Sequence, residues 1–204
     1  SGGSKTYDGN TSATVTYADN RIAGDVFTVS GTATYPSKTV GTKTITASSI
    51  TLSGTDAGNY SQNTSTTVSG TISSRSLTVT ISASNKTYDA LTAATVTYLD
   101  DRVTGDILTV SGTANFDTKN VGTGKTVTAT GIIIAGTDSG NYTRNTTATT
   151  TANITLRSLN VTISATSKTY DALTAATVTY SDNRVAGDSF TVSGTANFDT
   201  KNWG

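Results

Sequence analysis

The sequence of 204 residues contains no cysteine, no histidine, no methionine and no glutamate, and its 14 acidic residues are all aspartate. Without cysteine there is no disulfide framework and no thiol chemistry. Without cysteine and histidine the usual ligands of zinc, copper and haem are missing, and general acid–base catalysis would have to depend on Asp, Lys or Tyr. We therefore expect no cofactor and no enzymatic activity.

Net charge and long apolar runs are also lacking. Lys and Arg together number 14, so the formal net charge is zero, and such a chain has no electrostatic footprint for nucleic acid or an anionic membrane. No apolar run approaches the ~18 residues of a membrane span, and no signal-peptide pattern is present. We expect no nucleic-acid partner and no membrane span. Because the first residue is not methionine, we expect a processed chain or a window on a longer one.

What the sequence does contain is repetition. The motif KTYDALTAATVTY begins at Lys86 and again at Lys168, and a looser copy, KTYDGNTSATVTY, begins at Lys5. These starts are 81 and 82 residues apart, and the second and third copies are identical at 31 of their first 37 positions. A period of this size is enough for one small domain. The pattern predicts a first repeat over 1–74 that lacks a leading strand, a complete second repeat over 75–156, and the first half of a third over 157–204.

Threonine and serine supply 72 of the 204 residues, and their spacing favours strands over a disordered stalk. Leu77, Val79 and Ile81 alternate with threonines, which is the period-two pattern of a half-buried strand. In the complete repeat we predict strands near residues 77–84, 93–98, 107–116, 126–134, 142–148 and 152–156, separated by turns rich in Gly, Asp and Asn. The predicted fold is all-β, with tandem immunoglobulin-like antiparallel β-sandwich repeats of about 81 residues.

The copies carry the same series of motifs. KTYDG is followed by a strand rich in Thr and Ala, by GDxxTVSG, by LSGTDAGNY (52–60) or IAGTDSGNY (134–142), and by a strand leading into RSLTVT. In this series the chain resembles the YDG-type tandem repeat domain of bacterial filamentous-haemagglutinin-like surface adhesins. The resemblance implies an extracellular, tandemly arrayed β-sandwich with a spacing role, and it brings no catalytic residues. Ala90 and Ala172 replace the motif's glycine, so we expect the turn there not to require a positive φ.

The tyrosine–aspartate pair of each KTYD motif has two interpretations. One is a ligand platform. The other, which we favour, is a tyrosine packed at a strand end, with the aspartate capping the next turn. The pairs are Tyr7–Asp8, Tyr88–Asp89 and Tyr170–Asp171.

A second recurring set consists of two aspartates six residues apart with an arginine between them. Carboxylate oxygens in a Gly-bearing turn suit Ca²⁺, but the central arginine disfavours a cation and favours an Asp–Arg pair that braces the hairpin. We therefore expect no metal site. The weak calcium candidates are Asp19, Asp25, Asp100, Asp106, Asp182 and Asp188.

Three classes of function follow. The tandem copies, the neutral polar composition and the lack of a nucleophile–base cluster favour a structural spacer or filament module of a bacterial extracellular surface protein, which extends an adhesin or fibre from the cell. The alternatives are a multivalent adhesin repeat that itself binds carbohydrate or protein, and a filament polymerised by strand complementation between chains. The expected partners are neighbouring copies of the same repeat, with a host or surface glycan or protein as the ligand in the second case.

Overall fold

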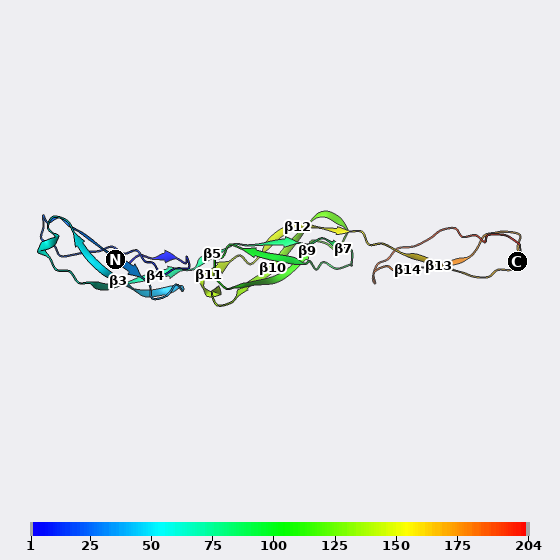
Figure 1. Cartoon of the computed structure of the whole chain (residues 1–204). Helices are drawn as coiled ribbons and strands as arrows, with labels where there is room; N and C mark the ends of the chain where they lie inside the picture. Colours follow the sequence, from blue (N-terminus) through cyan, green and yellow to red (C-terminus); the bar gives the residue numbers. More distant parts are fainter. Residues whose placement is uncertain (1, 203–204) are drawn as a thin grey trace. The chain divides into compact units, whose positions relative to one another are not determined.

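The computed structural model describes residues 2–202 and confirms an all-β fold (Figure 1). Helical structure within those residues is limited to the short 3-10 helices η1 (Ala57–Asn59) and η2 (Ser139–Asn141). The first repeat contains β1 (Lys5–Thr6), β2 (Thr28–Thr34), β3 (Gly41–Ser53) and β4 (Ser65–Ser73). The second contains β5 (Arg75–Leu77), β6 (Val79–Ala83), β7 (Lys86–Thr87), β8 (Val96–Asp100), β9 (Thr109–Phe116), β10 (Gly122–Ala135), β11 (Tyr142–Arg144) and β12 (Ala148–Thr155). The third contains β13 (Val161–Ala165) and β14 (Val178–Asp182).

The four strands of the first repeat form one sheet in the order β1-β4-β3-β2. The strands β2, β3 and β4 pair antiparallel, whereas β1 pairs parallel to β4. On β3 the threonines alternate with Ile45 and Ala47, which are 0% and 2% exposed. The parallel pairing of β1 and β4 differs from the predicted antiparallel arrangement. The sequence could not predict it, because a strand of two residues shows no period from which its pairing can be inferred.

The second repeat contains the same sheet, in the order β7-β12-β10-β9, with β7 parallel to β12. Its leading segment adds two strands: β5 pairs parallel with β11, and β6 pairs with β8. Leu77, Val79 and Ile81 of this segment are only 1%, 2% and 7% exposed. The predicted alternation of apolar and polar residues is therefore present, with the apolar members in the core.

The predicted strands of the second repeat are present with shifted ends. The strand predicted over 77–84 is interrupted at Thr78 and forms β5 and β6, and the strand predicted over 93–98 begins at Val96. The strand predicted over 142–148 ends at Arg144, and β12 begins at Ala148. The strand β7 was not predicted, because two residues are too few to show alternation.

The third repeat contains one hairpin-like pair among the described residues. The strands β13 and β14 are antiparallel, with Val161 opposite Asp182 and Ala165 opposite Val178. Val161 and Ile163 are 40% and 59% exposed, although their counterparts in the second repeat are buried. The apolar alternation is thus retained without a second layer to cover it in the part of the chain that is described.

The chain divides into two compact units. Unit one consists of Ser1–Ser82, Val96–Ala114 and Thr128–Thr149, and unit two of Ala83–Thr95, Asn115–Val127 and Thr150–Gly204. Unit one holds the whole first repeat and part of the second. The buried apolar side chains of unit two are Phe116, Val127, Ala152 and Ile154. Over residues 2–202, no helix has the length and hydropathy needed to cross a membrane.

Candidate functional site

The Asp-x-Arg sequence of each repeat forms a bidentate salt bridge, which we refer to as the Asp–Arg fork. The guanidinium of Arg21 donates to both carboxylate oxygens of Asp19, at 2.7 and 2.6 Å, and to the carbonyl oxygen of Phe27 at 2.6 Å. This bidentate bond from Arg21 lowers the pKa of Asp19 to about 2. The same fork recurs as Asp100–Arg102 and Asp182–Arg184. All three repeats therefore contain an Asp–Arg pair that braces the turn.

The second aspartate of each turn faces a tyrosine. The hydroxyl–carboxylate pairs are Tyr60–Asp25, Tyr142–Asp106 at 2.6 Å and Tyr88–Asp188 at 2.7 Å. The two carboxylates considered for calcium thus have different partners, an arginine and a tyrosine. Within residues 2–202, no three acidic side chains gather in a way that could hold a metal ion.

Asp106 is the centre of a buried network that joins the first repeat to the second, inside unit one. Its carboxylate accepts hydrogen bonds from the Tyr7 hydroxyl at 2.8 Å, the Tyr142 hydroxyl at 2.6 Å and the Lys38 ammonium at 2.8 Å. Tyr7 and Lys38 belong to the first repeat, whereas Asp106 and Tyr142 belong to the second. The Asp106 side chain is 2% exposed, and a carboxylate so buried requires charge-assisted partners of this kind.

These contacts fix the ionisation states at the centre of the network. Burial acts to raise the pKa of Asp106, but hydrogen bonds from Lys38, Tyr142 and Tyr7 outweigh burial and hold the pKa below its ordinary value. Burial, followed by the hydrogen bond to Asp106, raises the pKa of Tyr142 to about 12 and also raises the pKa of Tyr7. At neutral pH an anionic aspartate therefore lies between two neutral tyrosines and an ammonium group.

The turn around η2 completes this junction. The rings of Tyr7 and Tyr142 meet edge to face, with centroids 5.4 Å apart. The Asn141 side-chain oxygen accepts a hydrogen bond from the backbone N–H of Val40 at 3.0 Å, and Lys38 lies 3.3 Å from Asp138. The GTDSGNY turn of the second repeat thus contacts the KTYD tyrosine of the first repeat and the loop that contains Lys38 and Val40.

The three KTYD tyrosines differ in burial, and Tyr88 of the second repeat is half-buried. Tyr7 is 1% exposed, whereas Tyr170 of the third repeat is 64% exposed. Inside unit two, the hydroxyl of Tyr88 donates to Asp188 of the third repeat. In the first repeat, Asp25 and Tyr60 pair without a KTYD tyrosine among the described residues. The same tyrosine–aspartate contact is therefore used at both places where one repeat follows another.

The KTYD turn itself is held locally. The motif aspartates accept hydrogen bonds from the backbone N–H two residues later, as in the favoured interpretation: Asp8 from Asn10, Asp89 from Leu91 and Asp171 from Leu173. Lys86 donates to Asp89 at 2.8 Å and to the carbonyl of Leu91 at 2.7 Å. The expectation about the missing glycine is wrong, because Ala90 and Ala172 have φ values of 64° and 63°, beside 80° for Gly9. The capping aspartate and the lysine hold alanine in a region that favours glycine.

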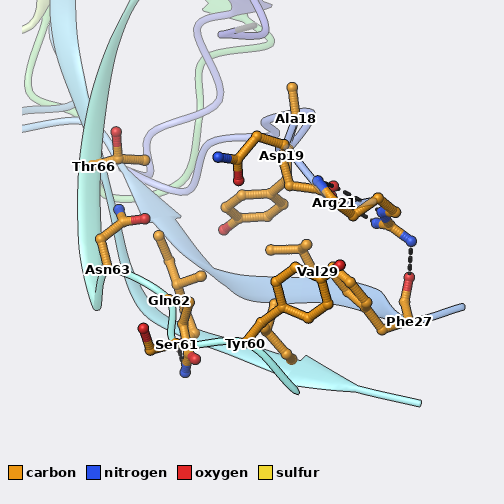
Figure 2. Close-up of a pocket in the computed structure, with 14 residues that line it drawn as sticks. Ala18, Asp19, Arg21, Phe27, Val29, Tyr60, Ser61, Gln62, Asn63 and Thr66 are labelled. Atoms are coloured by element: carbon orange, nitrogen blue, oxygen red, sulfur yellow. Dashed lines mark hydrogen bonds and ion pairs between the residues drawn. The ribbon is translucent and has the colours of Figure 1, made fainter. Parts of the chain in front are cut away.

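The first repeat also contains an open groove of about 440 Å³. Figure 2 shows the Asp19–Arg21 fork on one side, Gln62 and Asn63 on the other, and Val29 between them. We refer to this space as the first-repeat groove. It combines an apolar floor with polar groups along both edges.

Sequence reasoning missed the junction. It assigned Tyr7 to its own turn and Asp106 to a different turn, because the two are far apart in sequence and each motif was interpreted alone. One signal was available: KTYD, GD and GNY occur together in both of the first two repeats. Joint recurrence indicates a shared role for these motifs, but it does not indicate that the contact crosses from one repeat to the next.

Comparison with family models finds the YDG domain twice, over residues 1–68 and 73–152. Neither the curated proteins nor the solved structures gave a significant match. The two matched ranges cover more than half of the chain and include Tyr7, Asp106 and Tyr142 of the junction. The chain therefore belongs to the YDG domain family, of which it carries two detected copies.

Proposed function

We propose that the chain is a structural spacer module, in which YDG repeats are joined end to end to extend an adhesin or fibre from a bacterial cell surface. The proposal rests on one observation: residues of the recurring motifs form the contact between the first repeat and the second. Asp106 of the GD motif accepts one hydrogen bond across the junction, from Tyr7 of the YDG motif, and another from Tyr142 of the GNY motif in its own repeat. A repeat that carries both halves of such a contact can be added in any number, each copy interacting with its neighbours.

The recurring ion pairs support a structural role. The Asp–Arg forks pair Asp19, Asp100 and Asp182 with arginines, and the KTYD lysines are bonded to their capping aspartates. The extracellular location and the adhesin context rest on the resemblance of the motif series. We also propose that each complete repeat is a two-layer, immunoglobulin-like sandwich, in which β6 and β8 supply a layer over the four-stranded sheet.

A double-mutant cycle tests the junction. Tyr7→Phe and Asp106→Asn are made singly and together, and the free energy of unfolding is measured by chemical denaturation. A hydrogen bond to a buried charge predicts a coupling of about 1–2 kcal/mol. The matched control combines Tyr7→Phe with Asp25→Asn, whose effects should be additive within about 0.5 kcal/mol because no hydrogen bond joins them. Additivity in the first pair would contradict the role of the motif residues.

The spacer role is tested on cells. The chain is placed between an outer-membrane anchor and a fluorescent reporter, and the height of the reporter above the membrane is measured by energy transfer to a membrane dye. Inserting another copy of residues 75–156 should increase that height. Saturable binding of the purified chain to a polysaccharide or matrix protein, with no change in height on insertion, would instead favour the multivalent adhesin.

A further inference from the structure

The glycine of the first YDG motif lies against the second repeat, inside unit one. A methyl group at Gly9 would place its carbon 2.8 Å from the Cγ1 atom of Val103, whereas the optimal separation of two such carbons is about 3.5–4.0 Å. Valine is stiff at χ1 and has no flexible end that could move away. Gly9 therefore leaves the room that Val103 of the next repeat occupies.

Backbone conformation alone does not account for glycine at this place. Gly9 has a φ of 80°, but Ala90 and Ala172 occupy the same place in their turns at 64° and 63°. In the second repeat, the motif lysine and aspartate hold that turn although the residue carries a Cβ. Room for Val103 is therefore a second reason for glycine in the first motif, separate from its φ value.

The polar contacts of the first junction surround this close approach. Tyr7, two residues before the motif glycine, is 1% exposed and donates to Asp106, which follows Val103 by three residues. The N–H of Val40 donates to the Asn141 side chain at 3.0 Å. A shift that relieved a clash at Val103 would also move the turn that receives the tyrosine. The length of these hydrogen bonds therefore depends on a motif residue without a side chain.

The second junction carries alanine at this place and has different contacts. Ala90 stands at the position of the motif glycine, and Val185 stands at the position of the receiving valine. Tyr88 is half-buried there, although its hydroxyl still donates to an aspartate at 2.7 Å. Lys119, the counterpart of the lysine that bonds Asp106 at the first junction, is exposed. The tyrosine–aspartate bond thus tolerates a Cβ in the motif, and the closer contacts are found at the junction that carries glycine.

We propose that the residue after Tyr-Asp in each motif determines how closely the next repeat docks, and therefore which repeats fit as neighbours. Glycine admits the valine of the receiving turn and gives a close junction, with a buried tyrosine and the bond between Val40 and Asn141. Alanine keeps the tyrosine–aspartate bond and gives a wider junction. The inference rests on the proposed function, because it concerns the contact that joins repeats into an array. Matched residues at these two positions, Gly9 and Val103 at the first junction, then select the order of repeats.

Amide hydrogen exchange at Val40 in the full chain tests the inference, because the N–H of Val40 is held by the second repeat. Gly9→Ala should speed that exchange by about tenfold or more, because the clash with Val103 favours opening of the junction. In the background of Val103→Ala, the same change should alter the rate by less than about threefold, because the clash is then removed. The matched control is Gly24→Ala, at a glycine with φ of 106° and open space around it, and it should leave the rate unchanged.

Exchange at Ala47, in the middle of β3, reports whether the first repeat stays folded in each variant. Equal acceleration by Gly9→Ala with and without Val103→Ala, at Val40 alone or at both amides, would overturn the inference, because strain in the turn would be the whole effect. Tyr7→Phe is measured in parallel. If Tyr7→Phe speeds Val40 exchange and Gly9→Ala does not, this inference fails and the proposed junction stands. If neither change has an effect, the junction of the proposed function fails with it.

Discussion

Ala90 and Ala172 adopt a backbone conformation that residues with a Cβ seldom adopt, with φ near +64°. The left-handed region brings Cβ close to the following carbonyl, at a cost of about 1–2 kcal/mol for a residue other than glycine. Gly9 occupies the same place in the first repeat at φ 80°. The local bonds of Lys86 and Asp89 hold the turn at the second copy. The sequence showed a lost glycine, and only the backbone showed that the turn had kept its shape.

Replacing these alanines with glycine should therefore stabilise the repeats. For Ala90→Gly we expect a gain of about 0.5–1 kcal/mol, because relief of the strain exceeds the entropy that glycine adds to the unfolded chain. Chemical denaturation followed by circular dichroism measures it. The matched control is Ala94→Gly, at a position without positive φ, which should lose about 0.5–1 kcal/mol. Equal destabilisation by both changes would show that the turn stores no strain.

At the scale of the element, one sequence pattern gives two structures. Residues 15–19 and Val96–Asp100 share the pattern VTYxD, but they are arranged differently: Val96–Asp100 form β8, which pairs with β6, whereas Val15 forms an isolated bridge with Gly2. Alternation predicted where strands can form, and pairing with β6 made a strand of Val96–Asp100. The same limit explains the parallel pairs β1–β4 and β7–β12, since two-residue strands acquire their pairing from the sheet and not from their own sequence.

The leading strand provides a matched test of this dependence. Ile81 is 7% exposed and Ile163, at the same place in the third repeat, is 59% exposed. Ile81→Ala should destabilise the second repeat by about 2–4 kcal/mol, because it leaves a cavity in a packed layer. Ile163→Ala should cost less than about 1 kcal/mol. Residue-resolved hydrogen exchange separates the repeats. Similar losses at both positions would contradict the difference in burial.

At the scale of the whole molecule, the recurring motifs become contacts between repeats. The caps and forks join residues two to six apart and were open to inference from the sequence, as the Asp–Arg pair was. The junction could not be inferred from the sequence in this way, because the hydrogen bond from Tyr7 to Asp106 joins residues 99 apart. The repeat boundaries at 74/75 and 156/157 stay a prediction. A fragment spanning residues 75–156 should fold, with lower stability than in the chain, because Asp106 then lacks Tyr7 and Lys38.

The junction also sets a pH window for unit one. The pKa of Asp106 is lowered in the folded chain, so its stabilisation is present above the ordinary aspartate pKa and is lost as pH falls below about 4. The pKa of Tyr142 is raised from 10.0 to about 12, so its stabilisation is complete below pH 10 and is lost between about pH 10 and 12. We expect the melting temperature to change little between about pH 5 and 9 and to fall on both sides. In Tyr142→Phe the alkaline fall should be shallower, because that phenol no longer ionises, while the acid fall persists through the other paired aspartates. If the fall in melting temperature at alkaline pH is the same in Tyr142→Phe as in the parent, the buried phenol of Tyr142 does not control stability in that range.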